Sequence, residues 1–134
     1  MNVLTIVAHP VPTSFNHAIR CEVEAGLAEA GHEVKVADLY ADGFQPAMIE
    51  ADFAQFTDDP LPIAIQAEQA RVEWSDAMIF IFPLWWWSMP AMMKGWIDRV
   101  MSYGFAWKDP RDPDSAGMRR RKIIVMITAG DDAA

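Results

Sequence analysis

Residues Ala77–Pro90 read AMIFIFPLWWWSMP and give the clearest structural signal in the sequence. The opening AMIFIF is entirely apolar, which is typical of a strand buried on both faces of a parallel sheet. Apolar side chains at helical spacing then predict an amphipathic helix over Met89–Tyr103. A buried strand that leads directly into such a helix indicates an α/β fold.

The rest of the sequence repeats this alternation of strand and helix. Strands are predicted at Asn2–Ala8, His32–Asp38, Ala77–Phe82 and Ile123–Ile127, and helices at Asn16–Ala30, Ile63–Trp74 and Met89–Tyr103. Gly31 is placed to end the first helix. The order β-α-β-α-β-α-β predicts an open parallel sheet with helices on both faces. Residues 40–62 and 104–121 are expected to be loops.

The spacing of side chains also predicts which face of each helix is buried. The first helix should bury Ile19, Val23 and Leu27, and Ala67, Ala70 and Trp74 share one side of the second. In the third helix, Lys94, Asp98 and Arg99 are expected to point away from the apolar side. Cys21 lies inside the first helix and is expected to be a packing residue.

The composition limits the possible classes of function. With 134 residues, of which 52% are hydrophobic, we expect one domain over residues 1–134 with a substantial core. The net charge of −8 argues against nucleic-acid partners. The longest apolar run, 77–87, is far shorter than the ~20 residues that span a bilayer. Because no signal peptide, disulfide framework or metal-ligand cluster is evident either, we expect a cytoplasmic protein without a metal site.

Ligands of open α/β sheets bind beyond the carboxyl ends of the strands, so three segments matter most: 9–15, 83–89 and 128 onward. In and just after the first, Thr13, Ser14 and Asn16 lie where a helix N-terminus favours phosphate, although an ordinary N-cap is an alternative. This segment lacks the glycine patterns of dinucleotide and nucleoside-triphosphate sites. In the second, residues 85–87 are consecutive tryptophans, which favours a planar ligand or else a cluster that caps the sheet.

Three segments together resemble the flavin-dependent NAD(P)H:quinone oxidoreductases. They are AHPVPTSFNHAI (8–19), DLYADGFQPAM (38–48) and IFIFPLWWWSMPAMMKGWIDRVMSYGFAW (79–107). The resemblance implies a flavodoxin-like fold with strand order 2-1-3-4-5 and a flavin, FAD rather than FMN, at the carboxyl edge. It also implies NAD(P)H as co-substrate, a quinone or similar planar acceptor, and hydride transfer by a ping-pong mechanism.

The same resemblance implies roles for particular residues. The loop for the phosphate groups matches His9, Thr13, Ser14, Phe15 and Asn16; the segment along the isoalloxazine ring matches Pro83, Leu84, Trp85, Trp86 and Trp87; the other edge of the ring matches Thr128, Ala129 and Gly130. Phe105 and Trp107 match aromatic residues that line the nicotinamide and quinone pocket, often facing the partner subunit. Because they lie in a loop where nothing obviously covers them, we expect an exposed aromatic patch and a homodimer.

The chain also departs from the family pattern. Ala129 and Asp131 replace a threonine and a glycine, and Asp109 stands where the family has a second pocket aromatic. The chain stops at Ala134, before the family's last strand, last helix and Tyr/His pair, so no catalytic residue is identified. The strand Ile123–Ile127 is therefore expected to form an open, apolar sheet edge.

Other interpretations remain open at this point. The chain could be a flavin-binding electron-transfer module or a regulatory subunit of a potassium-efflux system that acts with a protein partner, or a non-catalytic fragment. The basic cluster Arg119–Lys122 is interpreted as a solvated turn before a buried strand, with a phosphate contact or partner surface as the alternative.

Overall fold

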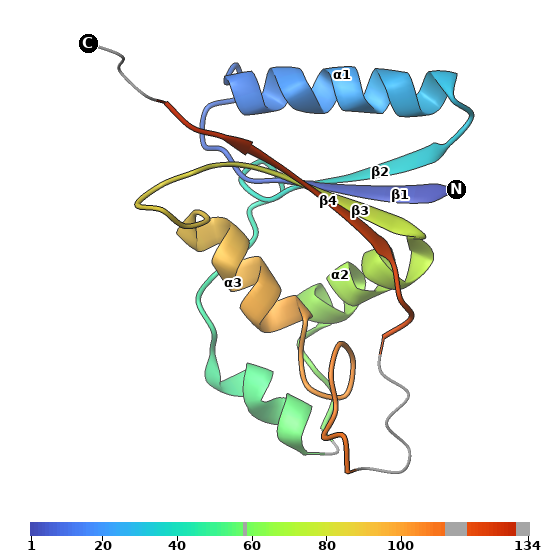
Figure 1. Cartoon of the computed structure of the whole chain (residues 1–134). Coiled ribbons are helices and arrows are strands. Elements are labelled where there is room, and N and C mark those ends of the chain that lie inside the picture. The colour runs from blue at the N-terminus through green and yellow to red at the C-terminus, as the bar shows by residue number, and fades with distance from the viewer. Residues whose placement is uncertain (58, 112–117, 131–134) are drawn as a thin grey trace.

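The computed structural model describes residues 1–57, 59–111 and 118–130. These residues form a four-stranded parallel sheet in the order β2-β1-β3-β4, with helices on both faces (Figure 1). The elements are β1 (Asn2–Val7), α1 (Phe15–Glu29), β2 (Glu33–Asp38), η1 (Glu50–Phe56), α2 (Ile63–Trp74), β3 (Ala77–Pro83), α3 (Ala91–Val100) and β4 (Lys122–Thr128). The predicted fold class and the strand order 2-1-3-4 are confirmed.

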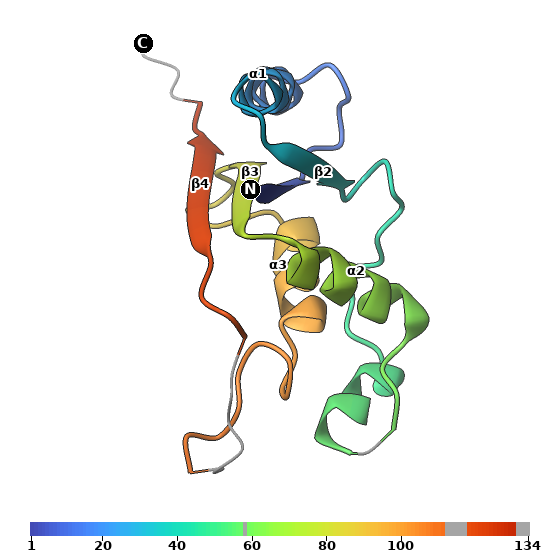
Figure 2. The same cartoon turned by 90° about the vertical axis from the view of Figure 1, so that its right-hand side faces the viewer.

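Two apolar clusters lie on opposite faces of the sheet, because alternate strand residues point to opposite sides. On one face, Val3, Val7 and Ile81 pack against the α1 stripe of Ile19, Val23 and Leu27, as predicted. On the other, Leu4, Ile6 and Phe80 pack against side chains of α2 and α3, including the fully buried Trp96. Figures 1 and 2 show α1 alone on its side of the sheet and α2 and α3 together on the other.

The register aligns the carboxyl ends of all four strands. Val7 lies opposite Asp38 on one side of β1, and Pro83 lies opposite Thr128 at the end of β3. The segments that follow β1, β3 and β4 therefore leave from the same edge of the sheet. In the described residues, no helix is both long and apolar enough to cross a membrane.

Three predictions about the helices are wrong. In α2 the buried residues are Ile65 and Val72, whereas Ala67 and Ala70 are exposed. Cys21 is exposed rather than packed. Residues 40–62 are not wholly a loop, since they include the short 3₁₀ helix η1.

The third helix also differs from its prediction, in extent and in its buried face. Helix α3 begins after Pro90, which precedes it as the cap residue, and ends at Val100. Arg99 is buried rather than solvent-facing. Its Nε donates to Asp52 Oδ2 at 2.8 Å and its Nη2 donates to Oδ1 at 3.1 Å. This ion pair joins α3 to η1, which is why a residue on the polar side of the helix pattern is buried.

Strand β4 is the outermost strand of the described sheet. It pairs with β3, and four of its apolar side chains, Ile123, Ile124, Val125 and Ile127, are about half-exposed. The expectation of an open apolar edge is confirmed in this part of the chain, and the interpretation of a buried strand after the basic cluster is wrong. Figure 2 shows β4 standing beside the helical layers rather than between them.

The basic residues before β4 attach that strand to the end of α2. Arg119 Nη2 and Arg121 Nε each donate to the carbonyl oxygen of Ser75 at 2.9 Å. Arg119 also pairs with Asp76, whose pKa is lowered first by the Asn2 backbone N–H and then by the Arg119 guanidinium. Burial lowers the pKa of Arg121. These arginines are thus structural contacts rather than a freely solvated turn.

Candidate functional site

The three segments singled out at the carboxyl edge contact one another. The rings of His9 and Trp85 lie 6.1 Å apart, which joins the first segment to the second. Asn16 Nδ2 donates to Thr128 Oγ1 at 3.0 Å, and Leu84 N donates to the Thr128 carbonyl oxygen at 2.8 Å. Residues more than a hundred positions apart in sequence therefore surround one place at the end of the sheet.

The first segment forms the N-terminus of α1. Ser14 is the N-cap, and its hydroxyl accepts from the His17 backbone N–H at 3.4 Å. Phe15 and Asn16 occupy the first turn, where backbone N–H groups have no carbonyl partner within the helix. Such groups, together with the helix dipole, favour a phosphate.

The predicted phosphate-loop side chains occupy different environments. His9 Nδ1 accepts from the Val11 backbone N–H at 3.1 Å, so the imidazole closes the loop on itself. Thr13 is exposed, and the Phe15 ring is 71% exposed. The Asn16 side chain is only 3% exposed and bonds to Thr128, so it holds two segments together instead of presenting its amide to solvent.

The second segment is a tight two-residue turn. Trp85 and Ser88 exchange backbone hydrogen bonds of 3.0 and 3.1 Å, and Trp86 and Trp87 between them have φ of 50° and 59°. Positive φ at both central residues is the geometry of a type I′ turn, which normally takes asparagine or glycine. The turn holds the Trp86 and Trp87 rings 96% and 89% exposed. Backbone strain of this kind is characteristic of ligand sites.

A cavity of about 440 Å³ lies between the tryptophan turn and the end of β4. It is lined by Leu84, Trp86, Trp87, Ala129 and Gly130. A volume of this size is typical of a small-molecule site, and its aromatic wall suits a planar ring. The unpaired backbone N–H groups at the N-terminus of α1 lie at the same edge of the sheet. The cavity and these N–H groups together fit a ligand that carries both a planar ring and phosphate groups, as flavin nucleotides do. Asp131 lies outside the described residues.

Phe105 and Trp107 are not part of this cavity. Phe105 packs half-buried against the core cluster, so the expectation that it lies uncovered is wrong, whereas Trp107 is 54% exposed. The tryptophan turn precedes α3 and Trp107 follows it, so they lie at opposite ends of that helix (Figure 1). A helix of this length extends ~15 Å. Within one chain, Trp107 and the tryptophan turn therefore lie at separate places.

Trp107 belongs to an aromatic cluster that the sequence interpretation missed. Its ring meets Tyr103 edge-on at 5.0 Å, and Tyr103 lies 5.8 Å from Phe56 of η1. These rings line a second cavity of about 540 Å³, whose rim carries Asp109 and Arg111. The guanidinium of Arg111 bonds to Asp109 at 2.7 Å and lowers the pKa of that carboxyl.

Comparison with known proteins agrees with this geometry. A family model described as flavodoxin-like fold matches residues 1–134. The solved NAD(P)H:quinone oxidoreductase of Methanothermobacter marburgensis superposes with a TM-score of 0.87 at 34% identity, covering 99% of this chain and 68% of that one. The chain belongs to this flavodoxin-like quinone oxidoreductase family.

Two further proteins to which this chain is similar are informative. A ribosyldihydronicotinamide dehydrogenase-like protein of Penicillium crustosum is 40% identical over 97% of this chain. The chain spans 58% of the length of that relative. General stress protein 14 of Treponema denticola, solved in complex with FMN, is 26% identical with a TM-score of 0.68 and covers 100% of this chain and 65% of its own.

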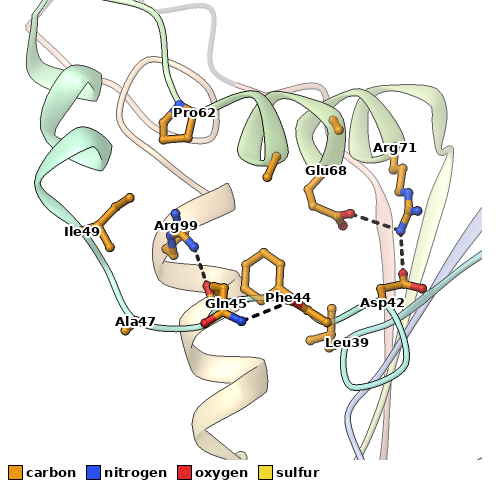
Figure 3. Close-up of a pocket in the computed structure, with 13 residues that line it drawn as sticks. Leu39, Asp42, Phe44, Gln45, Ala47, Ile49, Pro62, Glu68, Arg71 and Arg99 are labelled. Carbon is orange, nitrogen blue, oxygen red and sulfur yellow. Dashed lines mark hydrogen bonds and ion pairs between the residues drawn. The ribbon is translucent and has the colours of Figure 1, made fainter.

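This member of the quinone oxidoreductase family has another cavity, of about 600 Å³, that sequence reasoning did not find. It lies between residues 39–49 and α2, as Figure 3 shows. Its charged side chains all have partners: Arg71 contacts Asp42 at 3.2 Å and Glu68 at 3.1 Å, and Arg99 donates to the Gln45 carbonyl oxygen. The pairing indicates a structural role for these groups.

Proposed function

We propose that this chain binds a flavin at the carboxyl edge of its sheet and takes part in the reduction of quinones by NAD(P)H. The observation that carries the proposal is the cavity lined by Trp86, Trp87, Ala129 and Gly130 beside the open N-terminus of α1. Three segments distant in sequence contact one another there. When bound, the flavin would supply the hydride chemistry, alternately with NAD(P)H and with a quinone in one pocket.

The residues of the chain would bind and orient that cofactor. We assign the phosphate groups to the loop of His9, Thr13, Ser14, Phe15 and Asn16, and the ring to Pro83, Leu84, Trp85, Trp86, Trp87, Thr128, Ala129 and Gly130. The two backbone hydrogen bonds that close the turn use the N–H groups of Trp85 and Ser88. The backbone N–H groups of Trp86 and Trp87 are therefore available to the flavin ring. Donors placed in this way stabilise negative charge that develops on a bound group. We propose FAD as the natural flavin, with FMN as the alternative.

The separation of Trp107 from the tryptophan turn supports a homodimer. Because ~15 Å of helix lies between them in one chain, an aromatic wall for the nicotinamide and quinone would come from Trp107 of a second copy. The exposed rings of Trp107, Phe53 and Phe56 form a patch of the kind that marks interfaces. Light scattering at micromolar concentration should give about twice the 15.1 kDa chain mass. A monomer mass would contradict the shared pocket.

The decisive experiment is spectroscopic. The purified protein should show a flavin spectrum, as isolated or after incubation with FAD or FMN, and release of the flavin identifies which one it retains. Steady-state oxidation of NADH or NADPH with a quinone then tests the activity, and Trp86→Ala should weaken flavin retention. A protein that binds neither flavin would refute the proposal. Flavin binding without quinone turnover would favour an electron-transfer or regulatory role with a protein partner.

A further inference from the structure

A chain of polar groups leads from the N-terminus of α1 to the end of β2. Ser14 Oγ lies 2.9 Å from His17 Nδ1, and His17 Nε2 lies 2.9 Å from Asp38 Oδ2. The His17 side chain is only 8% exposed, whereas Ser14 is partly accessible. Asp38 also accepts from Arg20 Nη1 and from the Ala41 backbone N–H, each at 3.2 Å. Each of the three side chains, Ser14, His17 and Asp38, is therefore held by a defined neighbour.

The neutral imidazole leaves the serine hydroxyl unable to donate to a ligand. Nε2 faces a carboxylate, which only accepts, so the proton of a neutral His17 resides on Nε2. Nδ1 is then an acceptor, and the Ser14 hydroxyl must donate its proton to it. The hydroxyl has one proton, so a phosphate oxygen approaching Ser14 would meet a lone pair.

Protonation of the imidazole reverses the direction of the hydrogen bond between His17 and the Ser14 hydroxyl. With protons on both nitrogens, Nδ1 donates to Ser14 Oγ while Nε2 continues to donate to Asp38. Ser14 Oγ also accepts from the His17 backbone N–H, so both lone pairs are used and the hydroxyl proton is free to point outward. The Asp38 carboxylate remains bonded in both states. Adding one proton to the imidazole therefore changes what Ser14 presents to a ligand: a lone pair in the neutral state and the hydroxyl proton in the charged state.

We propose that His17 is a positioning residue whose protonation turns the Ser14 hydroxyl toward the phosphate groups of the flavin, so that binding of the flavin nucleotide takes up a proton. The inference rests on the proposed flavin site. Serine, histidine and aspartate also form hydrolase triads, but Ser14 here caps a helix that carries His17 one turn later. Its hydroxyl is placed to bind an anion at a helix N-terminus.

The surroundings of His17 determine how strongly the two events are coupled. Among the described residues, the charged or titratable groups around it are Asp38 at the end of β2, Arg20 on α1, which also pairs with Glu24, and His9, whose ring lies edge-on at 6.4 Å. Asp38 Oδ2 is shared by His17 Nε2 at 2.9 Å and Arg20 Nη1 at 3.2 Å, so the imidazole and the guanidinium meet at one carboxylate oxygen. A phosphate bound next to Ser14 adds negative charge to these surroundings, and a nearby negative charge favours the charged form of an imidazole.

The experiment is calorimetric titration of the flavin-free protein with FAD and with riboflavin between about pH 6 and pH 8.5, which includes the upper part of the range of about pH 5 to pH 8 in which histidines usually change charge. Riboflavin has the ring but no phosphate, and the pyrophosphate of FAD keeps its charge throughout this range. FAD affinity should fall with rising pH, by at most about tenfold per pH unit for one coupled proton. Riboflavin affinity should stay level. Repeating the titration in buffers of different ionisation enthalpy counts the protons taken up with FAD.

Two variants and a control isolate the effect. His17→Phe and Ser14→Ala should each abolish the proton uptake and reduce FAD affinity at pH 6 to about the wild-type value at pH 8.5. Ser14→Ala keeps the imidazole and its bond to Asp38, so it remains informative if His17→Phe folds poorly. His32→Asn should keep the coupling, because His32 lies at the opposite end of the sheet beside the N-terminal amine.

The result that would overturn the inference is FAD binding with the same proton uptake in wild type and Ser14→Ala, or with none in wild type. Failure to bind FAD, FMN and riboflavin at every pH would instead refute the flavin site, and this inference with it. Binding of riboflavin without any added affinity for FAD would keep the ring cavity and refute the phosphate role of Ser14.

Discussion

The tryptophan turn yields a prediction in which stability and binding change in opposite directions. Trp86 and Trp87 both have positive φ, a conformation that costs roughly 1–2 kcal/mol in a residue with a Cβ. Their side chains are almost fully exposed, so little burial offsets that cost. The change Trp86→Asn with Trp87→Gly provides the residues that a type I′ turn prefers.

The magnitude follows from these terms. Relief at two positions contributes about 2–4 kcal/mol by the figure above, and the greater freedom of glycine in the unfolded chain removes about 0.5–1 kcal/mol. Asparagine retains part of the strain, so we expect the flavin-free protein to gain about 1–2 kcal/mol, or roughly 4–7 °C in Tm for a chain of this size. Flavin affinity should fall about tenfold or more, because two aromatic contacts worth about 0.5–1.5 kcal/mol each are lost.

The assay is thermal unfolding of the flavin-free double variant followed by circular dichroism, together with fluorescence titration of FAD and FMN. Trp85→Ala is the matched control: Trp85 is only 41% exposed and contacts His9, so its removal should lower the Tm. A double variant that melts below wild type would refute the reasoning, because it would show that the two rings stabilise the protein without a ligand.

Three further predictions concern the frame around the site. Gly95→Ala should destabilise the folded protein by about 1–3 kcal/mol, because the added Cβ would lie 2.2 Å from the Pro46 carbonyl oxygen. Gly26→Ala, whose Cβ would have nothing within 4 Å, should instead stabilise it by about 0.5–1 kcal/mol, and urea unfolding of both variants tests this. Arg99→Met should cost about 3–5 kcal/mol in the same assay because it leaves the buried Asp52 charge unpaired, and adding Asp52→Asn should recover part of the loss. Asp76→Asn should lower the Tm at pH 7. Because the folded pKa of Asp76 is lowered, its contribution is present above about pH 4, its unfolded value, and is lost as the pH falls through the folded pKa, so the two melting curves should converge in acid.

Local patterns predicted the sheet well because its strands are buried in the way that their sequences imply. AMIFIF at 77–82 is buried on both faces in the middle of the sheet, and the alternating 33–38 segment is an edge strand. The position of Ser14 at a helix start also followed from local chemistry. The meeting of three loops followed from a topological rule, since parallel strands end at one edge.

The errors arise where a distant residue overrides the local pattern. Arg99 lies on the polar side of α3 by spacing, but Asp52 offers it a buried carboxylate from a segment that was predicted to be a loop. The buried side of α2 was misplaced for a similar reason. Glu68 bonds to the Trp96 indole N–H at 2.9 Å, and Gln69 bonds to the Val100 carbonyl oxygen at 3.0 Å, so polar residues share the packed side with Ile65 and Val72.

The same long-range contacts determine where Trp107 lies, and this links the misread segment to the proposed pocket. Gln55 of η1 accepts from the Tyr103 backbone N–H at 2.9 Å, and Gln69 of α2 donates to Ser102 Oγ at 2.9 Å. Because Arg99 and Asp52 hold η1 against α3, the loop that carries Trp107 is anchored by two other elements in addition to its own backbone hydrogen bonds, such as Gly104 N to the Trp107 carbonyl oxygen at 2.8 Å. A site that takes its cofactor residues from the sheet edge and an aromatic wall from this loop would therefore depend on the fold of residues 39–57, although none of those residues was assigned to the flavin. In the proposed pocket, the buried Asp52 would therefore act through Gln55 and Tyr103.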